Sequence, residues 1–504
     1  MVRQIPRRNE RLAATLCVML VGRPRPAPPA TSPTTTAPAQ PATTTATTTT
    51  TATTAAPKAK AIAAAVAGIV PAATSSFGPV NAGRVGAGTT AFDLRLGRST
   101  LSMSGLQHPT FEHALDQTTG SVARADNVVT PLFDGVASFA ERIRLIAGAT
   151  SSIHLQTFIF TDDDTGWNMA RHLAERANAG LDVRVIVDGL GSNRSDKAIF
   201  EYMRTAGVEV REHATGLALW SVNDRWHEKH MVVDGKVAVE GGMNIADEYS
   251  LGGSGRQVFR RNNSAPALDA WRDVDVRVEG AAVHDVQRAF LRNWSLLGDA
   301  VPAPSLAALF PAPTKTPGGP AVRVVQHHPN GDPPDDHTMQ LQVRAVKAST
   351  KSLLIENAYF LPPQALRDAL VDAAKRGVNV QVMTNSKSSS DMGFVVDASR
   401  HFYDELVEAG VSIYEKMGGT LHAKTMSIDG VYSIIGSANL NGRSDGRDTE
   451  CVVAIRDDKT AAALERRFAD GLAQTRPVLA AELNADTVLQ DVKQWALSTL
   501  AWTF

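Results

Sequence analysis

The chain carries one spaced pattern of functional residues twice, and this duplication restricts the folds that are open to it. The pattern is His, one residue, Lys, four residues, Asp, six residues, and then Gly-(Gly/Ser)-x-Asn. The first copy comprises His227, Lys229, Asp234, Gly241, Gly242 and Asn244, and the second comprises His422, Lys424, Asp429, Gly436, Ser437 and Asn439. Two intact copies predict two similar halves of the chain that together build one composite site.

The repeat extends well beyond these residues. Residues 144–152, followed by IHLQTFIF, align at an offset of 200 with residues 344–352, followed by LLIENAYF. Each segment predicts an amphipathic helix that leads into a buried strand. Two further helix–strand units match downstream, and Gly180 and Gly377 suit the helix ends. Helices that alternate with apolar strands predict two tandem homologous α/β domains, each a mixed, mostly parallel sheet flanked by helices.

Composition places the domain boundaries. A length of 504 residues indicates more than one domain, and we expect the first at 101–301 and the second at 321–504. The Pro/Gly-rich segment 302–320 is the expected linker. Residues 23–100 are rich in Pro, Thr and Ala and predict a disordered linker. Residues 1–22 combine a basic start with a short apolar run, which favours an export signal, with a disordered basic N-terminus as the alternative.

Charge and cysteine content exclude some classes of function. Residues 1–60 hold eight Lys/Arg against one acid, so the net charge of −1 leaves −8 on the remainder. A body of that charge disfavours general nucleic-acid binding. Cys17 and Cys451 indicate no disulfide framework.

The repeated residues suit chemistry on a phosphodiester without a metal. Such an enzyme must supply fixed positive charge and hydrogen-bond donors to the phosphate oxygens. Lys229 and Lys424 offer ammonium groups, and Asn244 and Asn439 offer amide donors. One neutral histidine can attack phosphorus, while the other donates a proton to the leaving alcohol.

Acidic partners are needed to orient the two imidazoles. Asp273 and Glu450 occupy matching positions, each opening an apolar strand, and we expect each to pair with the histidine of its own half. Asp234 and Asp429 also count as candidate catalytic residues. Each precedes a glycine, however, so a structural role in a hairpin turn is equally compatible with the pattern.

Several other residues are candidates for contact with the substrate. The candidate substrate-binding residues are Trp226, Gly242, Ser437, Tyr359 and Arg443. Phe158 and Trp220 can add to an apolar approach. The insertion 250–270 is locally basic, and a solvated loop is favoured over an anion-binding role. The apolar stripe of residues 488–504 favours a terminal helix packed on the core over a membrane-surface helix.

A metal site is the competing chemical interpretation. His227 and His230 resemble ligands, as do His327, His328 and His337 close to Asp332, Asp335 and Asp336. No short helical pair of ligands is present, and the segment from His327 to His337 is a Pro/Gly loop. We therefore expect a mechanism with no metal and no other cofactor.

At this point the residues resemble the phospholipase D superfamily, through HEKHMVVD…GGMN and LHAKTMSID…GSANL. The segments GGMN, GSANLNGRS, IENAYF and WRDVDVRVEG look most like its bacterial cardiolipin synthases, and the resemblance spans 127–504. It implies two domains related by a pseudo-twofold axis around one active site. It also implies His227 as a nucleophile that forms a phosphohistidine, His422 as general acid and base, and a phosphate held by the Lys and Asn residues of both copies. Many cardiolipin synthases begin with two transmembrane helices, whereas this chain has only the short run of residues 12–22.

The expected function is a phosphatidyltransferase or phospholipase D. With phosphatidylglycerol as donor and acceptor, the products are cardiolipin and glycerol. The alternatives are a hydrolytic phospholipase D, a nuclease-type phosphodiesterase and a non-catalytic envelope-binding protein. We expect a monomer that is exported or acts at the membrane surface of a bacterial envelope.

Overall fold

The structure is a computed structural model that describes residues 105–483 except 194, 214–223, 251–270 and 332, and beyond them 490, 493, 494 and 496–498. The chain divides into two units, Met1–Pro57 and Lys58–Phe504, and all described residues belong to the second. The predictions for residues 1–100, Trp220, the insertion 250–270 apart from Ser250, and most of the C-terminal stripe concern residues outside the described part.

The first half of the repeat forms a seven-stranded sheet. Its strands are β1 (Val128–Phe133), β2 (Ser152–Thr157), β3 (Asp182–Asp188), β4 (Glu209–His213), β5 (His230–Val233), β6 (Val237–Gly241) and β7 (Val274–Glu279). Their spatial order is β1-β7-β6-β5-β2-β3-β4.

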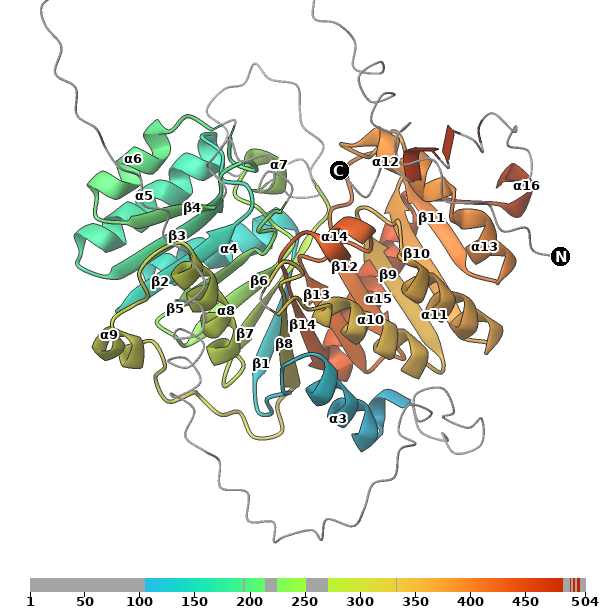
Figure 1. The fold of residues 1–504 in the computed structure, drawn as a ribbon, viewed down its shortest axis with the longest axis horizontal. Coiled ribbons are helices and arrows are strands. Elements are labelled where there is room, and N and C mark those ends of the chain that lie inside the picture. The colour runs from blue at the N-terminus through green and yellow to red at the C-terminus, as the bar shows by residue number, and fades with distance from the viewer. Residues whose placement is uncertain are drawn as a thin grey trace, which may run out of the picture. The chain divides into compact units, whose positions relative to one another are not determined.

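The second half forms an eight-stranded sheet with the same connectivity. Its strands are β8 (Ala321–His327), β9 (Ser352–Asn357), β10 (Asn379–Asn385), β11 (Ser412–Lys416), β12 (Lys424–Ile428), β13 (Tyr432–Gly436), β14 (Glu450–Arg456) and β15 (Thr475–Pro477). The order is β15-β11-β10-β9-β12-β13-β14-β8. Without β15, each strand has a counterpart in the first sheet, which confirms the predicted pair of tandem α/β domains (Figure 1).

The sheets are mixed, as predicted, but the expectation that they are mostly parallel was wrong. In the first sheet the only parallel pairs are β2–β3 and β3–β4, and in the second they are β9–β10 and β10–β11. All other neighbouring strands are antiparallel. The physical reason is that β5–β6 and β12–β13 are hairpins, and a tight turn can join only antiparallel strands.

Helices flank both sheets, and the predicted helix–strand units are present. The helices are η2 (Gly105–Gln107), α3 (Pro109–Thr118), α4 (Asp134–Ala147), α5 (Asp164–Asn178), α6 (Ala198–Thr205), α7 (Asp247–Ser250), α8 (Val283–Leu296), α9 (Ala303–Ala308), α10 (His337–Ala348), α11 (Gln364–Lys375), α12 (Gly393–Arg400), α13 (Tyr403–Glu408), α14 (Gly442–Gly446), α15 (Asp458–Leu472) and α16 (Ala480–Leu483). Gly180 and Gly377 follow α5 and α11 with φ of 88° and 89°, so both end their helices in the left-handed conformation as predicted. In the described part of the chain, no helix combines the length and apolar character needed to cross a membrane.

The two halves share a hydrophobic core. Buried residues of the first sheet, such as Val232 and Val276, pack in one cluster with Ile435 and Val453 of the second. This shared core includes Val232 of β5 and the residues Leu421 and Ala423 that flank His422, so it lies beside both repeated motifs.

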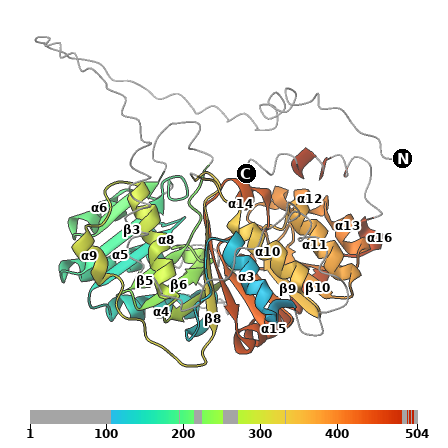
Figure 2. The same cartoon turned by 60° about the horizontal axis from the view of Figure 1, so that its bottom comes forward.

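Helix α3 precedes the first sheet in sequence but packs on the second. Its residues Phe111 and Leu115 lie in a core cluster with Leu341 of α10 and Leu353 of β9. Figure 2 shows α3 alongside α10. A first domain that begins at residue 101 therefore includes a helix that belongs structurally to the second half.

Candidate active site

Two short backbone bridges bring the repeated motifs of opposite halves together. Trp226 pairs in parallel with Thr449, and Arg272 pairs in parallel with Leu421. The N–H of His227 donates to the carbonyl of Thr449 at 3.0 Å, and the N–H of His422 donates to the carbonyl of Arg272 at 2.8 Å. Each histidine therefore lies beside the acidic residue of the other half.

The first histidine is held by Glu450. Nδ1 of His227 lies 3.0 Å from both carboxylate oxygens of Glu450. The hydroxyls of Ser437 and Ser444 donate to the same carboxylate at 2.5 and 2.6 Å. Burial opposes the charged form, but the nearby His227, Lys229 and Ser437 outweigh it and lower the pKa of Glu450 to about 2. Because Glu450 is ionised, Nδ1 of His227 carries the proton and Nε2 keeps its lone pair.

The second histidine is held in the same way by Asp273. Nδ1 of His422 lies 2.7 Å from Oδ2 of Asp273. The backbone N–H of Val274 donates to Oδ1 at 2.7 Å. Burial again opposes the charge, but His422 and Lys424 outweigh it and lower the pKa of Asp273.

The expected pairing of each acid with the histidine of its own half was wrong. Glu450 and Asp273 are the predicted acids, but each holds the histidine of the opposite half. The reason is that the residues before each histidine pair with the residues before the other half's acid. Both histidine–carboxylate pairs therefore cross the junction between the halves, and the site is complete only when the halves are together.

Both motif lysines lie next to the histidines in buried positions. Nζ of Lys424 is 2.9 and 3.0 Å from the two ring nitrogens of His422. Nζ of Lys229 donates to the carbonyl of His227 and lies 5.5 Å from the ring centre of Phe158. Burial lowers the pKa of Lys229 to about 8 and that of Lys424 to about 7, although nearby carboxylates favour their charged forms.

Burial also lowers the pKa of both histidines, and the neighbouring lysines add to the effect. The pKa of His227 and that of His422 are each about 4. At neutral pH both imidazoles are therefore uncharged, and the positive charge of the site is carried by Lys229, which is mostly protonated, and by Lys424, which is about half protonated. An anion bound between them would compensate two charges that the protein alone stabilises poorly.

The two motif asparagines are positioned by different contacts. Oδ1 of Asn244 accepts the N–H of Ile159 at 3.0 Å, which turns its amide NH₂ toward the hydroxyl of Tyr249 at 2.8 Å. The backbone N–H of Asn439 donates to Ser444 at 3.2 Å, and its buried Oδ1 has no hydrogen-bond partner among the residues that the structure describes. The amide of Asn244 is thus linked to His422 through Tyr249, whereas Asn439 is linked to Glu450 through its backbone N–H and Ser444.

Gly242 and Ser437 support the acids, and their role in substrate binding stays a prediction. A Cβ at position 242 would lie 2.2 Å from Oδ1 of Asp273, so only glycine leaves room for this carboxylate. At the matching position, Ser437 donates its hydroxyl to Glu450. The difference between the two copies of the motif therefore follows the difference between their acids.

The remaining substrate-binding candidates have mixed outcomes. Trp226 is 7% exposed, stacks on His213 with ring centres 4.3 Å apart and packs in a core cluster, and its contact with a substrate stays a prediction. Tyr359 donates its hydroxyl to Asp391 at 2.8 Å. Arg443 binds Asp448 through two nitrogens, each at 3.0 Å. Contact of Tyr359 or Arg443 with a substrate stays a prediction.

Two aromatic residues of the site, Tyr249 and Trp271, were not predicted from the sequence. Tyr249 and Trp271 lie against His422, with ring centres 5.1 and 5.3 Å away. The hydroxyl of Tyr249 is 3.5 Å from Nε2 of His422. A signal was present, because Tyr249 and Ser444 are each the fifth residue after a motif asparagine and each offers a hydroxyl. Phe158 was expected near the site, and its ring centre lies 5.2 Å from that of His227.

Asp234 and Asp429 belong to the scaffold, which corrects their place among the candidate catalytic residues. Both have positive φ, 55° and 56°, at the hairpin turns after β5 and β12. The carboxylate of Asp234 accepts the N–H groups of residues 150–152, and that of Asp429 accepts those of residues 350–352. Each carboxylate is thus committed to the start of the neighbouring strand, β2 or β9.

The loop proposed as an alternative metal site is arranged for hydrogen bonding. The two ring nitrogens of His327 lie 3.1 Å from Asp335 and 3.1 Å from the carbonyl of Asp445. Nδ1 of His337 lies 3.3 Å from the carbonyl of Gln326. These contacts occupy both ring nitrogens of His327 and one of His337, whereas Nε2 of His328 has no hydrogen-bond partner among the described residues.

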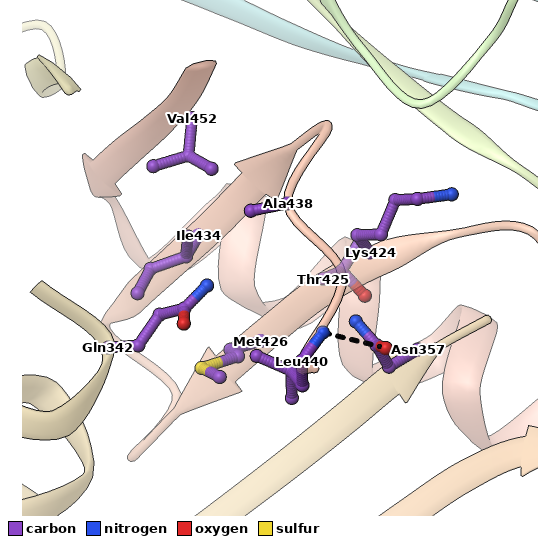
Figure 3. Close-up of a pocket in the computed structure, with 9 residues that line it drawn as sticks. All are labelled: Gln342, Asn357, Lys424, Thr425, Met426, Ile434, Ala438, Leu440 and Val452. Carbon is purple, nitrogen blue, oxygen red and sulfur yellow. Dashed lines mark hydrogen bonds between the residues drawn. The ribbon is translucent and has the colours of Figure 1, made fainter. Parts of the chain in front are cut away.

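A small cavity lies behind Lys424. Its volume is ≈ 10 Å³, room for about one water molecule. It is lined by Gln342, Asn357, Lys424, Thr425, Met426, Ile434, Ala438, Leu440 and Val452. In Figure 3 the amine of Lys424 points away from Gln342, and Asn357 accepts the backbone N–H of Leu440 at 3.1 Å. The cavity is therefore a packing feature beneath the lysine stem, separate from the face on which the lysine meets His422.

Comparison with known proteins agrees with this geometry. The family described as "Cardiolipin synthase, PLD-like domain" matches residues 143–251 and 343–471. The chain is 31% identical over 362 residues to "Cardiolipin synthase 1" of Bacillus cereus, covering 70% of this chain and 68% of that protein. It is 32% identical over 351 residues to "Cardiolipin synthase" of Halalkalibacterium halodurans, covering 69% and 66% of the two chains.

Among solved structures, phosphatidylserine synthase of Haemophilus influenzae matches with a TM-score of 0.59 at 15% identity, covering 78% of this chain and all of that one. This likeness concerns the fold alone. The two matched segments contain both copies of the histidine–lysine motif, in agreement with the composite site. The chain therefore belongs to the cardiolipin synthase family of phospholipase D-like proteins.

Proposed function

We propose that this chain is a phosphatidyltransferase that acts through a covalent phosphohistidine on His227 and converts two phosphatidylglycerol molecules into cardiolipin and glycerol. The observation that carries the proposal is the pair of crossed contacts, His227 with Glu450 and His422 with Asp273, each with a motif lysine beside it. The names of the similar proteins, cardiolipin synthases, support the choice of substrate.

In the first step, Nε2 of His227 attacks the phosphorus of the donor lipid. The new N–P bond forms as the bond from phosphorus to the head-group oxygen breaks. Glu450 stabilises the positive charge that develops on the attacking imidazole, because its carboxylate lies 3.0 Å from Nδ1. Lys229 and Lys424 attract the phosphate oxygens, on which negative charge rearranges during transfer.

His422 handles the proton of the leaving alcohol. Its pKa is lowered by burial and by Lys424 in the empty site. A bound phosphodiester anion offsets the lysine charges and so raises this pKa, which favours the protonated form. The imidazolium then donates its Nε2 proton to the departing glycerol oxygen, while Asp273 keeps Nδ1 in place.

In the second step, a hydroxyl of another phosphatidylglycerol attacks the phosphohistidine. His422, now neutral, takes the hydroxyl proton as the O–P bond forms and the N–P bond to His227 breaks. The product is cardiolipin, and both histidines return to their starting state. If water attacks instead, the product is phosphatidic acid, so exclusion of water decides between transfer and hydrolysis.

The proposed setting is the membrane surface, where the lipid substrates reside. We propose that one chain suffices, because both motifs and both acids belong to the same polypeptide. The rings of Phe158 and Trp271 beside the two histidines offer apolar contacts to a lipid that approaches the site.

The test is lipid mass spectrometry after the full-length protein is incubated with phosphatidylglycerol vesicles. The expected result is cardiolipin with an equal amount of glycerol from the wild type and none from His227→Ala. His172→Ala, a change on a helix surface, is the matched control and should keep activity. Phosphatidic acid without cardiolipin would instead establish hydrolysis. Cleavage of nucleic acid but not lipid would refute the proposal.

A further inference from the structure

Three potential metal ligands meet where the two sheets join, beside the active site but not in it. They are His230 at the start of β5, Glu240 near the end of β6, and Cys451 on β14 of the other half. One nitrogen, one oxygen and one sulfur from these residues lie within 4.8 Å of one another. The proposed chemistry uses none of the three.

These side chains are fully buried and poorly satisfied. His230, Glu240 and Cys451 each have 0% exposure. Among the described residues, both ring nitrogens of His230 and both carboxylate oxygens of Glu240 lack a hydrogen-bond partner of good geometry, and the thiol of Cys451 is the group that interacts with Glu240. Nδ1 of His230 is 3.4 Å from Oε2 of Glu240, too far and too poorly aligned for a good hydrogen bond. A buried polar group without a partner costs about 1–3 kcal/mol, so four such atoms in one place call for a ligand.

The repeat provides an internal comparison. By the alignment of the motifs, His230, Glu240 and Cys451 correspond to Thr425, Ile435 and Val274 in the opposite copies. The strand pairings agree, since His230 faces Glu240 on β6 as Thr425 faces Ile435 on β13. The fold therefore forms the same junction at its other copy with a threonine and two apolar residues. The scaffold does not require the polar trio.

Charge neutrality selects the kind of ligand. An ionised carboxylate and a thiolate buried without a cation would be very unfavourable, and the side chains of Glu240 and Cys451 are both fully buried. A divalent cation with one carboxylate, one thiolate and one neutral imidazole gives a net charge of zero. Loading the ion would release the carboxyl and thiol protons.

We propose that His230, Glu240 and Cys451 bind one structural zinc ion. Sulfur, imidazole nitrogen and carboxylate oxygen are the ligand set of zinc, whereas calcium and magnesium take oxygen ligands. Zinc bonds of about 2.0–2.3 Å place tetrahedral ligands about 3.3–3.8 Å apart, so the ligand atoms need to approach by about 1 Å. Neither oxygen of Glu240 has a hydrogen-bond partner of good geometry among the described residues, so the carboxylate can occupy more than one coordination position.

The zinc ion would hold in place the catalytic residues that adjoin its ligands. Each ligand adjoins a residue of the motif set: His230 follows Lys229, Glu240 precedes Gly241, and Cys451 follows Glu450. Two ligands come from the first half and one from the second, so the ion links the halves at the position where Glu450 reaches His227. With all three ligands buried, the ion has no access to substrate.

The first experiment measures metal content in full-length protein that has been dialysed against EDTA in the folded state. A closed structural site should retain its ion during this dialysis, so inductively coupled plasma mass spectrometry should find about one zinc per chain in the wild type. The variant His230→Thr/Glu240→Ile/Cys451→Val should hold less than about 0.1 zinc per chain. This variant carries the residues of the opposite copies. Glu240→Gln, which keeps the size of the side chain, gives the same loss if the triple variant fails to fold.

The second experiment identifies the ligands. The protein is unfolded with a chelator and refolded with Co²⁺, a spectroscopic substitute for zinc. A thiolate-to-cobalt charge-transfer band is expected for the wild type and should be absent from Cys451→Ser. Glu228→Gln is the matched control, because this buried carboxylate already accepts hydrogen bonds from Gln156, Asn293, Gln326 and Thr449.

Two results would overturn the zinc site. One is a wild-type protein that holds less than about 0.1 zinc both as purified and after refolding with excess Zn²⁺, which would make the trio a neutral cluster of carboxylic acid, thiol and imidazole. The other is zinc retained in Glu240→Gln and in the triple variant, which would place the metal elsewhere.

Discussion

Replacing Glu450 with Gln removes the carboxylate that holds Nδ1 of His227 and should slow formation of the phosphohistidine. The carboxylate lies 3.0 Å from Nδ1, so its charge is about 4 Å from the positive charge that develops on the ring. At an effective dielectric constant of about 20, that interaction amounts to about 4 kcal/mol, which corresponds to about a thousandfold loss of rate. Asp273→Asn makes the equivalent change at His422.

The two changes are separated by a lipid whose leaving group is p-nitrophenol. This leaving group needs no proton, so the first step depends on His227 and Glu450 but not on acid catalysis by His422. We expect Glu450→Gln to slow the burst of nitrophenol about a thousandfold. We expect Asp273→Asn to keep a burst rate within about tenfold of the wild type and to slow the later turnover, when His422 must deprotonate the acceptor.

Asp448→Asn is the matched control for Glu450→Gln. This carboxyl lies two residues away, is bound by Arg443, and burial raises its pKa to about 7. Asn keeps the size of this side chain and removes a carboxylate that does not contact His227, so the burst should stay within about tenfold of the wild type. If Asp273→Asn abolished the burst while Glu450→Gln spared it, each acid would serve the histidine of its own half, and the crossed pairing would be refuted.

Four further outcomes follow from the site. Asp429→Ala leaves three backbone N–H groups without their acceptor and should lower the free energy of unfolding by about 2–3 kcal/mol. Thermal or urea denaturation measures this loss, and the activity per folded molecule should be retained. An inactive but fully stable variant would contradict the scaffold role of Asp429. Gly242→Ala should push Asp273 away and slow turnover at least as much as Asp273→Asn, whereas wild-type kinetics would mean that the carboxylate tolerates the shift. With the nitrophenyl lipid, kcat/KM should fall as the pH drops through about 4, because His227 becomes protonated. It should fall again as the pH rises through about 7 to 8, because Lys424 and Lys229 lose their protons. If kcat/KM did not fall in this alkaline range, the lysines would be excluded as phosphate-binding cations. EDTA added to folded enzyme should leave turnover within about twofold, since the chemistry needs no metal and a buried zinc ion is protected; rapid loss of activity would indicate a metal that contacts substrate.

Local sequence patterns were sufficient for the architecture and the reactive groups. The duplicated spacing around His227 and His422 predicted two similar domains and one shared site, because only a duplicated fold places both copies in equivalent positions. Gly180 and Gly377 marked the helix ends before buried strands, since a left-handed residue there favours glycine. The hairpin role of Asp234 and Asp429 was visible as an alternative in the Asp-Gly pairs.

The prediction of mostly parallel sheets overestimated the number of parallel strands, because local patterns reveal only part of each sheet. Alternation of helices and strands reveals β2 to β4 and β9 to β11, which are joined by crossover helices. The remaining strands follow one another through short turns or long irregular segments, and their direction depends on which neighbours they join in the sheet.

The sequence alone determined which groups are available: two histidines, two lysines, two asparagines and two acids in matching positions. Only the tertiary structure decided which acid serves which histidine, that Gly242 makes room for Asp273, and that His230, Glu240 and Cys451 meet. The physical reason is that these contacts join residues up to 223 positions apart, from His227 to Glu450. Their partners are set by the packing of one half on the other, and spacing along the chain carries no record of that packing.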